Sequence, residues 1–162
     1  MEHTGGILSA IEHSWLGEVA RTSVWLYPTA NVGHILALTV FAASVAMMDA
    51  RLLGAFRAIA PGPFLRTARY VAMGAFTVML LTGSVLFAAE ATHVAANPVF
   101  QIKLVLISLA LLNALVFEFV ASRHVRSLPE RAALPAFARV NAAISLGLWF
   151  SVAAAGRLIA YF

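Results

Sequence analysis

The chain contains no cysteine, and only 11% of its 162 residues are charged. The missing cysteine excludes disulfides, thiolate metal sites and cysteine nucleophiles. The low charge lies well below the roughly 25% of a typical soluble domain, whereas hydrophobic residues reach 62%. No glycine-rich phosphate loop, nucleophile elbow or HExxH motif occurs either. The composition therefore predicts an integral membrane protein, and the missing catalytic motifs favour a protein that is not an enzyme.

Four long apolar segments carry most of the hydrophobic residues. Each has about 20 or more residues, enough at about 1.5 Å per residue to cross a hydrocarbon core of about 30 Å. The predicted spans cover approximately residues 27–49, 70–89, 98–121 and 137–160. Pro61-Gly62-Pro63 is a helix breaker between the first two spans, and Asn97-Pro98 is a typical helix start. We therefore expect an all-α, four-helix membrane bundle over residues 27–162.

Residues 1–26 precede the first span and have a different pattern. Apolar residues recur at three- and four-residue spacings, at Ile7, Leu8, Ile11, Trp15 and Val19. Polar residues occupy the positions between them, which is typical of an amphipathic helix lying on a membrane surface. We expect such a helix on the periplasmic side.

Arginines are concentrated in two of the connecting segments. Eight of the eleven Lys and Arg residues follow the first or the third span: Arg51, Arg57, Arg66, Arg69, Arg123, Arg126, Arg131 and Arg139. The positive-inside rule places these two loops in the cytoplasm. In a bacterial inner membrane, both termini and residues 90–97 would then be periplasmic. The net charge of +4 follows from this topology, so we expect no nucleic-acid partner.

Each span also supplies one ionisable residue near the expected periplasmic side. These four form the predicted outer polar layer: His34, Glu90, Lys103 and Arg157. An ionisable group inside a membrane costs on the order of several kcal/mol unless it is paired or hydrated. We expect Glu90 to neutralise Lys103 or Arg157, and His34 to stay neutral. The layer is either a functional site or a set of hydrogen bonds that fastens the helices together.

A second polar set lies in the expected cytoplasmic half and comprises Asp49, Arg51, Asn113 and Glu118. We expect Asp49 and Arg51 to cap their helix and to extend toward the interface. Glu118 lies near the boundary of the arginine-rich loops, so an arginine partner is expected for it.

A bound cofactor is one interpretation of the outer polar layer. A b-type haem in a helical bundle usually takes two axial ligands, most often histidines. His34 is the candidate inside a span, and His93 or His13 could be the second ligand. Copper would bind histidine and methionine, with His34 and His93 as candidate ligands. The internal methionines are expected to lie away from His34: Met47, Met48, Met73 and Met79.

A family resemblance covers most of the chain, from about Trp15 to the end. It is carried by His34, Glu90-Ala and five runs: Ser23-Val-Trp25-Leu-Tyr-Pro28, Asp49-Ala-Arg51-Leu-Leu-Gly54, Asn97-Pro98-x-Phe100-x-x-Lys103, Asn113-Ala-Leu-x-Phe117 and Ala155-Gly156-Arg157-x-Ile-Ala-Tyr161-Phe162. With these residues the chain resembles a family of small bacterial inner-membrane proteins of unknown function. That family is distantly similar to the membrane domain of CopD-type copper-resistance proteins.

The resemblance implies a four-span protein whose outer polar layer matches characteristic family positions. Two residues depart from the pattern. Glu118 stands where relatives have a histidine, and His93 does not match a strong family position. A mechanism that needs an imidazole at position 118 is therefore not expected here.

Three functions are compatible with these patterns. The first is a non-enzymatic protein that binds haem b or copper around His34 for electron transfer or metal handling. The second is an accessory or structural subunit that binds a membrane-complex partner or a second copy of the chain. The third is a conduit for protons or small anions, which would need a homo-oligomer because four spans alone form a poor transporter. The lipid bilayer is the surrounding partner in each case.

Overall fold

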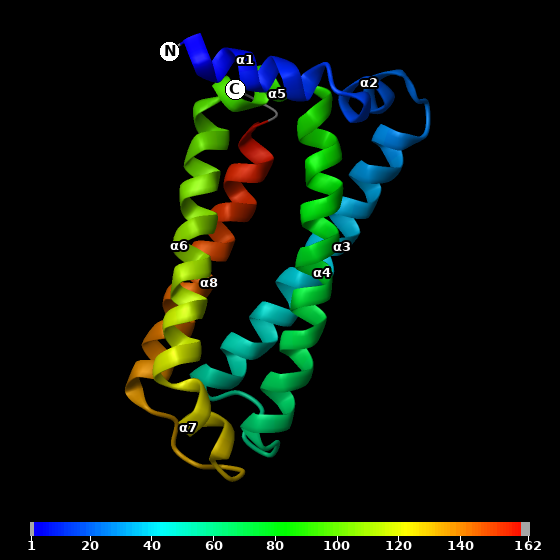
Figure 1. The fold of residues 1–162 in the computed structure, drawn as a ribbon. Helices are drawn as coiled ribbons and strands as arrows, with labels where there is room; N and C mark the ends of the chain where they lie inside the picture. The colour runs from blue at the N-terminus through cyan, green and yellow to red at the C-terminus, as the bar shows by residue number, and fades with distance from the viewer. Residues whose placement is uncertain (1, 160–162) are drawn as a thin grey trace.

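The computed structural model describes residues 2–159, which form eight helices and no strand (Figure 1). Four of the helices are long: α3 (Leu26–Leu53), α4 (Pro61–Ala89), α6 (Pro98–Val120) and α8 (Ala136–Leu158). All four are long and apolar enough to cross a membrane. The predicted all-α, four-helix membrane bundle is therefore confirmed. The expected end of the last span, at residue 160, lies outside the described residues.

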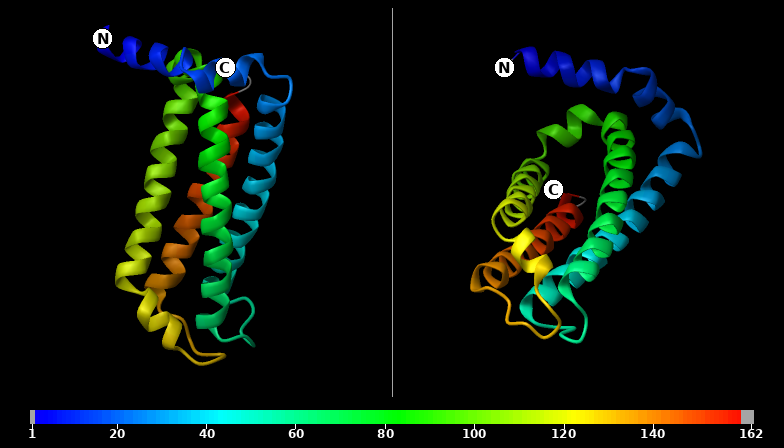
Figure 2. Two further views of the ribbon diagram at one scale, coloured as in Figure 1. Left: turned by 45° about the vertical axis from the view of Figure 1, so that its right-hand side comes forward. Right: turned by 60° about the horizontal axis from the view of Figure 1, so that its bottom comes forward.

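The long helices pack as two pairs. Helix α3 lies along α4, helix α6 lies along α8, and α3 also packs against α8. Figures 1 and 2 show the resulting bundle from three sides. Within residues 2–159, no comparable packing joins α4 to α6. The bundle is therefore closed through α3 and α8 and less tightly closed on the side between α4 and α6.

Four short helices cover the two ends of the bundle. Helices α1 (Glu2–Glu12), α2 (Trp15–Thr22) and α5 (Ala91–Ala96) lie at one end, here called the capped end (Figure 1). Helix α7 (Ser122–Ser127) and the α3–α4 loop lie at the other, here called the arginine-rich end. The N-terminal segment thus covers one end of the bundle, but as two helices and not one. Ser14 separates them and caps α2, with its hydroxyl oxygen accepting a hydrogen bond from the Gly17 N–H.

Helix α4 begins nine residues earlier than the sequence analysis predicted. Pro61 and Pro63 lie in its first turn, where a backbone N–H has no intrahelical partner and proline fixes a helical φ. The proline pair therefore starts a helix at this point. Helix α3 ends earlier, at Leu53, and the following residue, Gly54, has the left-handed φ of 109° that favours glycine.

The buried core lies in the middle and at the arginine-rich end of the bundle. One cluster contains Leu52, Leu65, Ala121, Val125, Ala138 and Ala142. The other surrounds Phe41, whose ring meets Trp149 edge-on at a centroid distance of 4.6 Å. These contacts hold the two helix pairs together and leave the capped half less filled.

Candidate ligand-binding site

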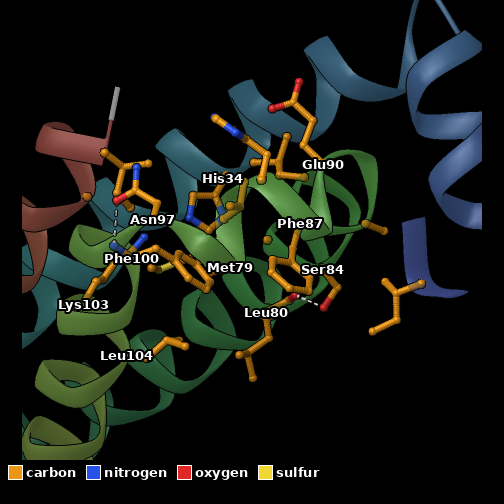
Figure 3. A pocket seen from close by; sticks show the side chains of 18 of the residues that line it. His34, Met79, Leu80, Ser84, Phe87, Glu90, Asn97, Phe100, Lys103 and Leu104 are labelled. Atoms are coloured by element: carbon orange, nitrogen blue, oxygen red, sulfur yellow. Dashed lines mark hydrogen bonds between the residues drawn. The ribbon is translucent and has the colours of Figure 1, made fainter. Parts of the chain in front are cut away.

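A cavity of about 1290 Å³ occupies the capped half of the bundle. Residues of α3, α4, α6 and α8 form its walls, and residues of α1 and α5 line it from the capped end. Most of the lining is apolar, as Leu80, Phe87, Phe100 and Leu104 show in Figure 3. Its volume exceeds the roughly 300–1,000 Å³ of an ordinary small-molecule pocket. Although few backbone contacts join α4 to α6, their side chains meet through the Arg69–Glu118 ion pair and, beside the cavity, through the stacked rings of Phe87 and Phe100, whose centroids lie 5.6 Å apart.

The His34 ring lines this cavity and is oriented by Thr82 on the neighbouring helix. The Thr82 hydroxyl donates its only hydrogen to the Val78 carbonyl, 2.7 Å away. His34 Nδ1 lies 2.9 Å from the same hydroxyl oxygen, and we assign the ring hydrogen to Nδ1, so that the imidazole donates to Thr82. The ring also interacts with the Met79 backbone carbonyl of α4, and in a neutral imidazole of this tautomer Nε2 keeps its lone pair. Nε2 is thus available to a ligand in the cavity.

Gly83 allows the close approach of His34 to α4. A Cβ at this position would lie 3.2 Å from His34 Cε1, tighter than ordinary van der Waals contact. Sequence reasoning identified His34 but missed the roles of Thr82 and Gly83. Small and hydroxyl residues are both common in membrane helices. The sequence Thr82-Gly83 therefore does not indicate a contact with His34 until the position of α3 against α4 is known.

Lys103 reaches the same cavity from α6. Its ammonium group lies beside the end of α8, where a Cβ on Gly156 would be 3.5 Å from Nζ. The two ion pairs formed within residues 2–159 both involve Glu118, and neither involves Lys103. Lys103 also forms no side-chain hydrogen bond with a described residue. The cavity therefore contains a cation without a protein counter-ion.

The other predicted members of the outer polar layer have different positions. Glu90 lines the cavity, but among the described residues it forms an ion pair with neither Lys103 nor Arg157. The expected neutralisation by Glu90 is therefore wrong. Figure 3 shows Glu90 and Lys103 on opposite sides of His34. Arg157 does not line the cavity, although its neighbour Gly156 does.

The residues considered as a second haem or copper ligand also differ in whether they line the cavity. His93 lines the cavity from α5. His13 does not; it lies just after α1, with its Nδ1 2.8 Å from the Ser9 carbonyl oxygen of that helix. Met79, expected to lie away from His34, in fact lines the same cavity. The described residues include no group of three or more His, Cys, Asp or Glu side chains that could hold a bare metal ion.

Helices α1 and α2 are fixed over the cavity by polar contacts. The Glu12 carboxylate accepts hydrogen bonds from the Thr92 hydroxyl and from the Thr92 N–H, the latter at 2.9 Å. These bonds hold the pKa of Glu12 below its usual value. Arg21 Nη1 donates to the Ala89 carbonyl oxygen at 3.1 Å. The N-terminal helices therefore dock on the corner between α4 and α5.

The second polar set lies away from the cavity, and two of its members correct the sequence prediction. Asp49 and Arg51 were expected to extend toward the interface, but they are only 5% and 1% exposed. Arg51 donates to the Ile59 carbonyl oxygen through Nε and Nη2, at 3.2 and 3.0 Å, and so closes the loop after α3. Asp49 faces the α8 residue Ser145. Both residues lie inside α3, which continues to Leu53, four residues beyond the predicted end at 49, and both are among its buried residues.

The other two members connect helices. Glu118 pairs with Arg69 of α4 at 2.5 Å and with Arg126 of α7 at 2.8 Å, which confirms the expected arginine partner. Asn113 and Asn141 exchange side-chain hydrogen bonds between α6 and α8. These contacts fasten the arginine-rich half of the bundle.

Comparison with known proteins gives one match. The model of a family described as "Family of unknown function (DUF6644)" matches residues 7–162. The chain belongs to this family. No curated protein and no solved structure matches the chain. Membership of DUF6644 confirms the expected likeness to a family of unknown function, whereas the similarity to CopD-type proteins stays a prediction.

Proposed function

We propose that this protein binds haem b in the cavity, with His34 as an axial ligand, and serves as a non-enzymatic electron carrier. The observation that carries the proposal is the His34–Thr82 bond. A metal-ligating histidine usually donates its other ring N–H to a neighbouring acceptor, which fixes the tautomer and the ring orientation. Here Nδ1 donates to Thr82, and Nε2 remains available in a large apolar cavity.

The chemistry of the cavity suits an amphipathic anion. Haem b has an apolar macrocycle and two carboxylates, so its ring matches the apolar walls and a carboxylate matches the unpaired Lys103. The second axial ligand would be His93 or Met79, which both line the cavity. Once bound, the haem iron would supply one-electron chemistry, while His34 and the apolar walls would set its ligation and exclude water.

A bare copper ion is the weaker candidate for this site. The porphyrin supplies four ligands of its own, so haem needs only one or two from the chain. Copper would depend on protein donors alone, and the described residues bring no three His, Cys, Asp or Glu side chains together. A site made only of His34, His93 and Met79 would bind copper(I) with soft and imidazole donors.

The first test is an absorption spectrum of the protein purified from cells supplied with haem precursor and copper, with metal analysis of the same sample. We expect a Soret band, with sharp α and β bands after dithionite reduction. His34→Ala should lose haem, whereas His124→Ala, a matched control outside the cavity, should keep it. Haem content unchanged in His34→Ala would overturn the proposal, and stoichiometric copper without haem would replace it with the copper site.

We also propose that the capped end is periplasmic and the arginine-rich end cytoplasmic, in a bacterial inner membrane. The proposal follows from the positive-inside rule. Because the chain has no cysteine, a single introduced cysteine gives an unambiguous label. In intact spheroplasts, an impermeant maleimide should modify Ala95→Cys in α5 and spare Ser127→Cys in α7. The opposite pattern would reverse the topology.

A second candidate function is that of a cofactor-free accessory subunit whose cavity holds an anionic lipid. The apolar lining and the unpaired Lys103 favour it, because an acyl chain could lie along the cavity walls while Lys103 pairs with the headgroup. Native mass spectrometry would detect a retained anionic lipid in a colourless, metal-free protein. Loss of that lipid in Lys103→Gln would support this function. Equal retention of the lipid would show that Lys103 does not bind its headgroup.

A further inference from the structure

Asp49 is a buried carboxyl group in the arginine-rich half of the bundle, outside the cavity described above. Its side chain is 5% exposed, and its Oδ2 has no hydrogen-bond partner among the described residues. It lies on the buried face of α3 between Val45 and Leu52, which belong to the two core clusters. A carboxyl group thus occupies a position where the helix pattern would otherwise have an apolar side chain.

The helices packed against this part of α3 offer no counter-ion. Helix α8 presents the hydroxyl of Ser145 to the carboxyl group. The nearest cation along α8 in sequence is Arg139, which is exposed at the start of that helix. On α3 itself, the buried Arg51 directs its guanidinium at the Ile59 carbonyl oxygen.

Helix α4 carries two arginines near the same end, and each has another contact. Arg69 is paired with Glu118 at 2.5 Å. The Arg66 guanidinium lies 5.9 Å from the centroid of the Tyr70 ring. Within the described part of the chain, no cation forms an ion pair with Asp49.

An ionised carboxylate in this position would lack both water and a compensating charge. Such a group is far more costly to bury than the neutral acid, so it takes up a proton or binds a cation. The neutral acid can share its hydrogen with Ser145, and its carbonyl oxygen tolerates a missing partner better than a charged oxygen does. Cation binding would require several further oxygen ligands.

We propose that Asp49 is a proton-binding site of the bundle, where the buried carboxyl group holds its proton at neutral pH and releases it as the pH rises. The reaction is a simple acid–base exchange in which the carboxylic acid gives its proton to water or hydroxide and regains it from hydronium. The end of α3, at Leu53, is four residues away, or about 6 Å along the helix, so the exchange takes place with the arginine-rich side. This site is independent of any ligand in the cavity.

The experiment uses the fact that Asp49 is the only aspartate in the chain. Cell-free synthesis with aspartate carrying ¹³C in its side-chain carboxyl, followed by reconstitution into lipid, labels this one group in the unaltered protein. At neutral pH, the infrared band that shifts with the label should be the carbonyl stretch of a protonated acid. Raising the pH should replace it with carboxylate bands.

Two variants complete the test. Asp49→Asn should remove the protonated-acid band, and Glu130→Gln, a control in the exposed loop, should leave it unchanged. If Asp49→Asn does not fold, the pH dependence of the infrared bands in the labelled, unaltered protein still tests the proposal. Label-sensitive carboxylate bands at neutral pH would overturn the proposal. If those bands also depended on sodium or potassium, the site would bind a monovalent cation in place of a proton.

Discussion

The reciprocal contact of Asn113 and Asn141 allows a quantitative prediction about the bundle. Asn113 Nδ2 donates to the Asn141 carbonyl oxygen at 3.2 Å. Asn141 Nδ2 donates to the Asn113 carbonyl oxygen at 3.0 Å and to Asn113 Oδ1 at 2.8 Å. Only the last of these three bonds needs both side chains. Asn113→Ala therefore removes the first and third bonds, and Asn141→Ala removes the second and third.

Side-chain hydrogen bonds between membrane helices contribute about 0.6 kcal/mol each on average. Each single variant should then lower the free energy of unfolding by about 1.2 kcal/mol, and the double variant by about 1.8 kcal/mol. The sum of the single effects exceeds the double effect by the shared bond, so the expected coupling is about 0.6 kcal/mol. The loss of side-chain volume at each position affects the single and the double variants alike, so it largely cancels in the coupling energy of this double-mutant cycle.

The measurement is reversible unfolding of all four proteins in mixed detergent–lipid micelles, followed by circular dichroism. Ser108→Ala provides a matched control, because Ser108 lies on the same helix and bonds only to the Leu104 carbonyl of its own helix. Combined with Asn141→Ala, it should show additive effects. A coupling indistinguishable from zero for the asparagine pair would refute the assignment of the shared bond.

Three further predictions concern the contacts at the two ends. Glu118→Gln loses two ion pairs whose side chains are 30% to 38% exposed. After allowance for solvent screening we expect a loss of about 1 kcal/mol, or about 2–4 °C in Tm; a decrease equally large in high salt would contradict an ionic origin. Thr92 holds the pKa of Glu12 below its ordinary value of 4.5, so the docking of α1 should be complete above that pH and weaken as the pH falls through the lowered folded-state pKa. Hydrogen exchange in α1 should show this dependence, and Glu12→Gln should abolish it. Gly17→Ala would bring a Cβ to 2.7 Å from the Ala88 carbonyl oxygen of α4 and to 2.3 Å from the Glu12 carbonyl oxygen, so it should undock α2 and increase its proteolysis. Gly74→Ala, whose Cβ would have nothing within 4 Å, should not.

Much of the architecture could be predicted because it depends on local pattern. Long apolar runs require membrane-spanning helices, since backbone groups in lipid must be satisfied within the segment. The boundary predictions were less accurate at proline. Pro61-Gly62-Pro63 was interpreted as a break, and the structure has the prolines in the first turn of α4. The same tripeptide is compatible with both outcomes until the neighbouring α7 is placed beside it, where a Cβ on Gly62 would lie 2.6 Å from the Arg126 carbonyl oxygen.

The candidate site was only partly predictable for a different reason. Periodicity places His34 and Lys103 at comparable depths, and both line one cavity. Depth alone does not give the rotation of each helix about its axis. The expected pairing of Glu90 with Lys103 was therefore wrong, and the position of Met79 in the cavity was missed.

Local patterns along the chain were enough to predict an all-α membrane protein with four spans, polar groups at two levels and arginines at one end. Those properties follow from hydropathy, length and charge, which act within each segment. Three features became visible only in the folded bundle: Thr82 orients His34, and neither Lys103 nor the buried Asp49 has a counter-ion within residues 2–159. Each of these depends on which faces of the helices meet, and helix packing fixes those faces through contacts between residues far apart in the chain.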